Sequence, residues 1–455
     1  MGEREGEHHS GESSEEEGGL RRILSPRVLT LFILGDILGT GIYVLAGDVA
    51  GEVGGAIWVP LMVAVTLAFL TAFSYSELVT KYPQAAGAAL YVDKAFGVPL
   101  VTFLVAFAVV MSGVTSASAA ASAFGTDYLS VFIELPVLVV ALVFITLIAA
   151  INFRGISESS KTNAVFTVIE ASGLLLIIVI GIITLISGDG DPGRAMEFKQ
   201  GANIPLAILA GATLAFYALI GFEDSVNVAE ETKDPIRVYP KALFRGLTAA
   251  AIIYFLVAFT ASMVVDTGRL AGSDAPLLEV VEVSDFPIPL EVFSLVALIA
   301  ITNTALLNMV MASRLTYGMA RQGIIPSVLS RVHEGRRTPL IAIVLTTLLA
   351  FVLIITGDLE VLAATTVALL LGTFAMVNIS CLVARQRSPV DHDHFNAPTI
   401  FPVLGAIACL VLLTQQEAAV YQRAGILLLI GLVLWVVNRL VTGRTRNPEA
   451  ADARS

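Results

Sequence analysis

The chain has 455 residues, of which 56% are hydrophobic and 14% are charged, and its mean hydropathy is +0.83. Soluble domains carry about 25% charged residues, so this composition excludes a soluble globular protein and predicts an integral membrane protein. The formal net charge of −11 comes largely from glutamates near the N-terminus and gives no reason to expect a nucleic-acid partner.

Residues 1–22 are expected to form an acidic, disordered tail in the cytoplasm. The stretch lacks the basic start and short apolar core of a signal peptide. Its many like charges and few apolar residues also cannot support a packed core.

Apolar runs of about 20 residues, long enough to cross a bilayer as helices, recur about twelve times after this tail. The fold class predicted is therefore an all-α integral membrane protein with about 12 transmembrane helices. We place these segments at residues 28–50, 56–80, 98–125, 135–152, 163–187, 204–230, 242–265, 288–318, 339–356, 359–385, 400–414 and 424–441.

The basic residues between these segments predict the orientation of the chain. Most lysines and arginines fall in the even-numbered connections and in both tails, while the odd-numbered connections hold only Arg194, Lys199, Arg269 and Arg423. Basic loops remain on the cytoplasmic side. We therefore expect both termini in the cytoplasm and a multi-pass protein in the plasma membrane.

The first segment contains residues that a simple membrane anchor would avoid. Gly35, Gly39 and Gly41 interrupt it, and Asp36 lies among them. An interior glycine costs a helix about 0.5–1 kcal/mol relative to alanine, and a charge near the bilayer centre costs at least about 2.5 kcal/mol. One interpretation is a helix that unwinds at a binding site, because free backbone groups are tolerated there when they line a cavity. The other is close helix packing through small residues.

The sixth segment resembles the first, because Gly221 interrupts it and Glu223 and Asp224 follow directly. Two interrupted segments at positions one and six are the pattern expected of two inverted five-helix repeats with discontinuous helices 1 and 6. The repeats would span residues 23–190 and 191–386, followed by helices 11 and 12 in residues 387–441 and a cytoplasmic tail in residues 442–455.

Five motifs follow one another along residues 24–440. They are Gly39-Thr40-Gly41-Ile42-Tyr43-Val44, the loop from Glu77 to Tyr91, Tyr217-Ala218-Leu219-Ile220-Gly221-Phe222-Glu223, the stretch from Glu230 to Pro240, and the stretch from Ser313 to Pro326. Together and in this order they resemble the motifs of the amino acid–polyamine–organocation (APC) superfamily of permeases. The resemblance implies the LeuT-like fold, with helices 1 and 6 unwound, and transport of amino acids or related amines.

The same resemblance implies where a substrate would bind. Its carboxylate would meet the backbone N–H groups of residues 39–42, at the start of a half-helix whose N-terminus carries about half a positive charge. Its ammonium group would donate to carbonyl oxygens in the sixth segment, and two aromatic rings there would wall the pocket or simply pack in the core. The residues concerned are Gly39, Thr40, Gly41 and Ile42 for the carboxylate, Tyr217, Ala218 and Ile220 for the ammonium, and Phe216 and Phe222 for the walls.

Polar residues on other segments are further candidates. Thr115, in a run of small residues of the third segment, could contact the substrate side chain, although helix packing also explains that run. Asn303 and Asn308 of the eighth segment are candidate cavity-lining groups. The paired histidines His392 and His394 are interpreted as part of a solvated loop, since a metal site needs further ligands in a set geometry.

Glu170 in the fifth segment departs from the family pattern, because some proton-coupled relatives carry a lysine there. A buried carboxylate could load and release a proton during transport. Asp36 could share that proton if it lies nearby, or the two carboxylates could bind a cation jointly. Glu170 could also serve only to hydrogen-bond neighbouring helices.

These observations predict a secondary transporter that moves amino acids by alternating access, most simply coupled to a proton through Glu170. The alternative is an amino acid or amine exchanger that uses no ion gradient. A membrane-embedded enzyme would need a motif such as His-Glu-x-x-His, which the sequence lacks, and a receptor would need a larger soluble region. The expected partners are the substrate and the lipid bilayer. No cofactor or metal is expected besides the coupling proton, and oligomeric state is not predicted.

Overall fold

The computed structural model describes residues 24–84, 87–154, 160–229, 231–284, 286–333, 336, 338–387 and 392–442. Within these ranges the secondary structure is helical, apart from three isolated backbone bridges. The acidic tail, the C-terminal tail and Glu230 of the fourth motif lie outside the described residues.

Ten helical stretches of the described chain are long and apolar enough to cross a membrane, and two shorter apolar helices join them, which confirms the predicted twelve segments. The first half comprises α1 (Pro26–Ile37), α2 (Thr40–Val44), α3 (Ala46–Val53), α4 (Trp58–Lys81), α5 (Gly87–Phe96), α6 (Pro99–Phe124), α7 (Asp127–Ser130), α8 (Val137–Arg154) and α9 (Ser160–Ser187). The second half comprises α10 (Ile204–Ala215), η3 (Phe216–Leu219), η4 (Phe222–Val228), α11 (Pro235–Val264), α12 (Thr267–Ala271), α13 (Pro276–Val283), α14 (Leu290–Arg321), α15 (Leu340–Thr356), α16 (Leu359–Arg387), α17 (Ile400–Leu413) and α18 (Ala418–Thr442).

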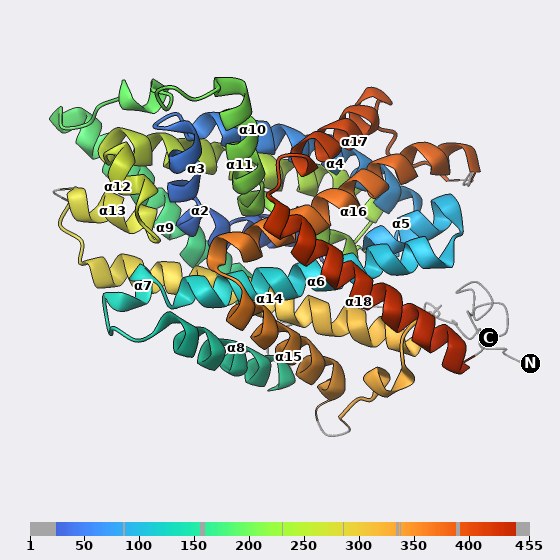
Figure 1. Cartoon of the computed structure of the whole chain (residues 1–455). Coiled ribbons are helices and arrows are strands. Elements are labelled where there is room, and N and C mark those ends of the chain that lie inside the picture. The colour runs from blue at the N-terminus through green and yellow to red at the C-terminus, as the bar shows by residue number, and fades with distance from the viewer. Residues whose placement is uncertain are drawn as a thin grey trace, which may run out of the picture.

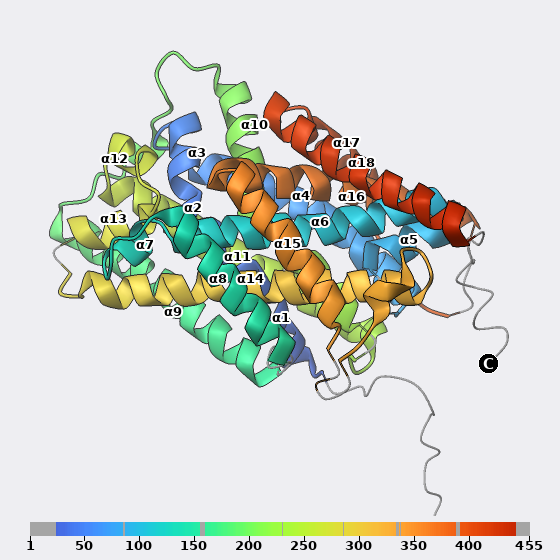
Figure 2. The same cartoon turned by 60° about the horizontal axis from the view of Figure 1, so that its bottom comes forward.

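Helix α6 runs through the centre of the molecule and packs along both α14 and α16 (Figure 1). Helix α1 lies against α9 and α11, while α4 packs against α10, α11 and α17. Helix α18 runs along the outside in both views (Figures 1 and 2). Its lipid-facing residues, such as Leu429 and Val433, are exposed, as expected for a helix that meets hydrocarbon on most of its surface.

The two interrupted helices begin in the same way. Ser25 caps α1 by accepting a hydrogen bond from the Val28 N–H, and Asn203 caps α10 by accepting one from the Leu206 N–H. In each case a proline follows within the first two helical positions, where its missing N–H costs no helical hydrogen bond. Each first half-helix then runs for 12 residues before it breaks.

Both breaks fall where the glycines predicted them. Helix α1 ends at Ile37, Gly39 is extended, and α2 begins at Thr40. In the sixth segment Ile220 is extended and Gly221 has φ of +126°, a conformation that glycine adopts at low cost and other residues rarely adopt. The discontinuous helices 1 and 6 of the sequence prediction are therefore confirmed.

Candidate substrate and coupling site

The glycines of the two breaks serve close packing as well as unwinding. A Cβ atom on Gly41 would lie 2.4 Å from the Cα of Ala218, and one on Gly221 would lie 2.5 Å from the Asp36 carbonyl oxygen. Real Cβ atoms do not approach neighbours that closely, so only glycine lets the two breaks touch. The helix is therefore broken and also closely packed, while a binding site at the break remains a prediction.

The start of α2 is tied to α14 at Thr304. The Thr40 N–H donates to the Thr304 Oγ1 over 3.0 Å, and a Cβ on Gly39 would collide with the same hydroxyl oxygen at 2.2 Å. The Thr40 hydroxyl is buried and has no hydrogen-bond partner among the described residues. Thr304 thus supplies an acceptor to an N–H that the helix break leaves free, and sequence reasoning did not identify it.

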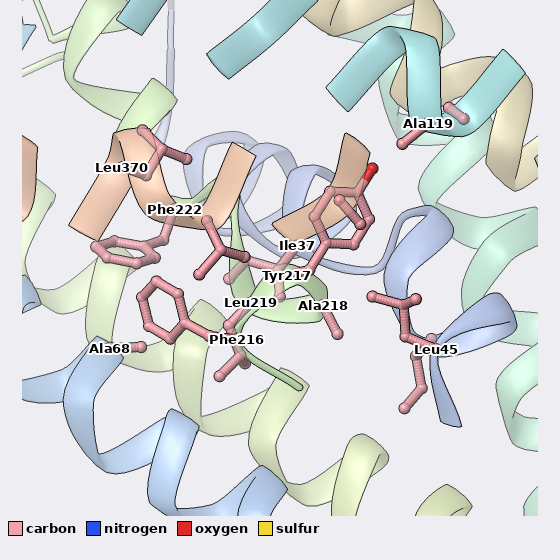
Figure 3. Close-up of a cluster of buried hydrophobic side chains, with 14 of the residues drawn as sticks. Ile37, Leu45, Ala68, Ala119, Phe216, Tyr217, Ala218, Leu219, Phe222 and Leu370 are labelled. Carbon is pink, nitrogen blue, oxygen red and sulfur yellow. The ribbon is translucent and has the colours of Figure 1, made fainter. Parts of the chain in front are cut away.

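Aromatic side chains surround the break in the sixth segment (Figure 3). Phe216 and Phe222 lie on one side of the η3 backbone, and both rings pack against Phe374 at centroid distances of 6.0 Å and 5.4 Å. Tyr217 points away from them, and its hydroxyl shares a 3.2 Å hydrogen bond with Ser116 on α6. Ile42, on α2, is also buried. All four side chains contribute to the packed core around the breaks.

Thr115 uses its hydroxyl within the protein. The Thr366 Oγ1 on α16 donates to the Thr115 Oγ1 over 2.9 Å, and the Thr115 hydroxyl bonds to its own helix at the Met111 carbonyl. The residue therefore joins α6 to α16 in this arrangement. A role toward a substrate side chain remains a prediction.

Glu170 lies in α9 and is fully buried. The Asn303 Nδ2 donates to the Glu170 Oε1 over 2.9 Å, and the Tyr43 hydroxyl donates to the Glu170 backbone carbonyl over 2.9 Å. The second carboxylate oxygen, Oε2, is buried without a hydrogen-bond partner in the described chain. Glu170 therefore sits where α9, α14 and the second half of helix 1 meet, with one oxygen available.

Asp36 lies in the last turn of α1 and faces the break in the sixth segment. Its backbone and Cγ contact Gly221 of the sixth segment, and among the described residues no hydrogen bond joins Asp36 to Glu170. Its Oδ2 is buried and unpaired within the same part of the chain. A proton or cation shared between the two carboxylates remains a prediction.

Small cavities continue from the break in the sixth segment. One of about 20 Å³ is lined by Ile220, Glu223, Asp224 and Asn308, and a second of about 40 Å³ also contacts Glu223 and Asp224. Such volumes hold one to a few water molecules and not an amino acid. A larger cavity of about 420 Å³ lies at the ends of α3 and α6 and is lined by four carboxylates, Asp48, Asp274, Asp358 and Glu360. A further cavity of about 20 Å³ lies at the breaks, lined by Gly41, Ile42 and Ala218.

Comparison with known proteins assigns this architecture to a family. The pattern of the family described as "Amino acid permease" matches residues 24–437. The branched-chain amino acid permease of Bacillus subtilis strain 168 is 26% identical over 441 residues, covering 92% of this chain and 93% of that protein.

Two further relatives show the range of the family. The methylthioribose transporter of the same strain is 27% identical and covers 86% of this chain and 87% of its own length. Cationic amino acid transporter 4 of Mus musculus is 28% identical and covers 85% of this chain and 64% of its own length. The chain therefore belongs to the amino acid permease family of the APC superfamily, whose members are multi-pass membrane transporters.

Proposed function

We propose that this protein is a secondary transporter that carries amino acids across the cell membrane by alternating access, coupled to a proton through Glu170. The single observation that carries the coupling is the carboxylate of Glu170, which is fully buried at the junction of α2, α9 and α14 with its Oε2 unpaired among the described residues. An ionisable group held inside a membrane protein is expensive and by default indicates function.

The broken helices support amino acid binding. The N–H groups at the start of α2 favour a carboxylate, and the carbonyls of η3 and of Ile220 can accept hydrogen bonds from an ammonium group. Both ends of an α-amino acid would thus meet backbone groups. The side chain of the substrate would meet residues of α6 and α16, such as Thr115 and Thr366.

The relatives differ in cargo, since their names specify branched-chain amino acids, methylthioribose and cationic amino acids. Backbone groups serve all α-amino acids alike, so we assign this chain the class of α-amino acids and not one member. The cavities described at the breaks, of about 20 to 40 Å³, are smaller than such a substrate, so we propose that the two broken helices move relative to α6 and α14 when it binds.

An exchanger without ion coupling is the second candidate. The observation that favours it is the Asn303–Glu170 hydrogen bond, because a carboxylate that only joins α14 to α9 would need no proton cycle.

Uptake into proteoliposomes tests the proposal. Vesicles holding the full chain are given each of the labelled amino acids, with and without an inward proton gradient, and with and without unlabelled amino acid inside. Accumulation driven by the gradient is the expected result. Uptake that occurs only against internal amino acid would establish the exchanger, and no uptake of any amino acid would overturn the substrate class.

A further inference from the structure

The hydroxyl of Tyr254 lies between the two broken helices. Tyr254 belongs to α11 and is fully buried. Its hydroxyl oxygen is 2.5 Å from the Ile37 carbonyl oxygen and 3.0 Å from the Ala218 carbonyl oxygen. A tyrosine hydroxyl has one hydrogen to donate, so a single donor is shared between two acceptors that lie 181 residues apart (218 − 37) in the chain.

Both acceptors belong to the breaks. Ile37 is the last residue of α1, and Ala218 lies in η3, two residues before the extended Ile220. Carbonyls at the end of a helix have no partner within that helix, and a buried carbonyl without a hydrogen bond is costly. Tyr254 therefore supplies, from a third helix, the donor that continuous helices would have provided.

The surrounding contacts leave little freedom for these groups. Gly41 touches Ala218 directly, and Gly221 touches Asp36 on the adjoining turn. Any displacement of Ala218 thus moves the break in helix 1 as well. The Tyr254 hydroxyl is the polar contact that both breaks share on the α11 side.

We propose that Tyr254 is a positioning residue that changes hydrogen-bond acceptors when substrate binds. Without substrate its hydroxyl supports both carbonyls. When the substrate ammonium donates to the Ala218 carbonyl, the Tyr254 hydroxyl donates its hydrogen bond to the Ile37 carbonyl alone. No buried carbonyl is then left without a donor in either state. The inference rests on the proposed function, because it takes the Ala218 carbonyl as one acceptor of the ammonium group.

Tyr254→Phe should therefore bind substrate more tightly while the empty protein becomes less stable. In that variant the Ile37 and Ala218 carbonyls both lack this donor before substrate binds. The ammonium group then supplies a donor to the Ala218 carbonyl, so the free energy of binding is more favourable than in the parent. We expect Kd to fall about tenfold, equivalent to about 1.4 kcal/mol, and turnover to slow because release becomes harder. A residue that only supports the fold would lower stability and leave Kd unchanged or raise it.

The measurement is scintillation-proximity binding to the purified full chain with tritiated L-leucine, L-alanine and L-arginine, which sample apolar, small and cationic side chains. If the parent binds none of them, the proposed function is at fault. If the parent binds one and Tyr254→Phe binds it equally or more weakly, the inference about Tyr254 is overturned and the proposed function stands.

Tyr239→Phe is the matched control. Tyr239 lies in the same helix, is equally buried, and its hydroxyl is bonded to the Ser225 hydroxyl at 2.6 Å. That variant should lose stability without a gain in affinity.

If Tyr254→Phe does not fold, Tyr254→3-fluorotyrosine retains the hydroxyl as a stronger donor that competes for the Ala218 carbonyl. Its Kd should rise about twofold, and an unchanged Kd would contradict the proposal.

Discussion

The side-chain amide of Asn303 donates a hydrogen bond of 2.9 Å to the carboxylate of Glu170, joining α14 to α9 in the interior of the protein. A neutral amide partner satisfies one oxygen without neutralising a charge. A buried carboxylate without a paired cation is costly to ionise. Within the described residues no ion pair involves Glu170, and this arrangement is suited to a group that exchanges a proton.

Gly41→Ala tests the contact between the two breaks. The added Cβ would lie 2.4 Å from the Ala218 Cα, so backbone must shift, and such overpacking costs about 1–3 kcal/mol. We expect a lower melting temperature in detergent and loss of uptake. Gly372→Ala in α16 is the control, because nothing lies within 4 Å of its Cβ position. Equal melting temperatures and equal uptake in the two variants would show that the Gly41–Ala218 contact is not needed for stability or transport.

Thr304→Val tests the support of α2. The variant removes the acceptor of the Thr40 N–H and should cost about 1–3 kcal/mol, the price of a buried donor left unpaired. Thr302→Val, two residues earlier on α14, removes only a hydroxyl that bonds to its own helix at Leu298. Thermal unfolding should show a clear fall in melting temperature for Thr304→Val and little change for Thr302→Val. Similar values would count against a role for Thr304 at the break.

An ion pair between α4 and α16 provides a third test, with Glu77 buried and the Arg385 side chain 24% exposed. The Arg385 guanidinium donates to both oxygens of Glu77 over 2.7 Å and 2.5 Å, and the Ala397 N–H also donates to Glu77. Glu77→Gln removes the charge that Arg385 and the Ala397 N–H both contact, so the variant should unfold at a lower temperature.

The exposed pair of Arg237 and Asp234, separated by 3.9 Å, supplies the control for that variant. Arg237→Gln should change stability by less than about 1 kcal/mol. The double variant Glu77→Arg and Arg385→Glu exchanges the two charges and should recover part of the stability that Glu77→Gln loses. A Glu77→Gln protein as stable as the parent would show that the α4–α16 pair contributes nothing.

The sequence predicted the helix breaks well because local rules determine them. Glycines at 39, 41 and 221 interrupt apolar runs, and prolines with capping residues mark where α1 and α10 begin. The boundary at Gly357 and Asp358 between α15 and α16 was also placed correctly, since two polar or flexible residues are enough to end a helix that lies in lipid.

The sequence could not predict contacts between distant segments. The partners Glu77 and Arg385 are 308 residues apart, and Tyr254 is one of many aromatic residues in apolar runs. The sequence left open how Asp36 and Glu170 are oriented; in the structure Asp36 contacts Gly221 and Glu170 bonds to Asn303. Each of these contacts depends on the rotation of a helix about its axis. In helices that are apolar on nearly all sides, the hydrophobic periodicity of the sequence does not reveal that rotation.

The most direct test of the account compares the parent with Glu170→Gln in proteoliposomes, measuring labelled amino acid uptake with and without an inward proton gradient. The variant keeps the size of the side chain and a hydrogen-bonding group for Asn303 but cannot ionise. We expect gradient-driven accumulation in the parent, and in the variant only exchange against internal amino acid. Gradient-driven accumulation that survives in Glu170→Gln would contradict coupling through this residue.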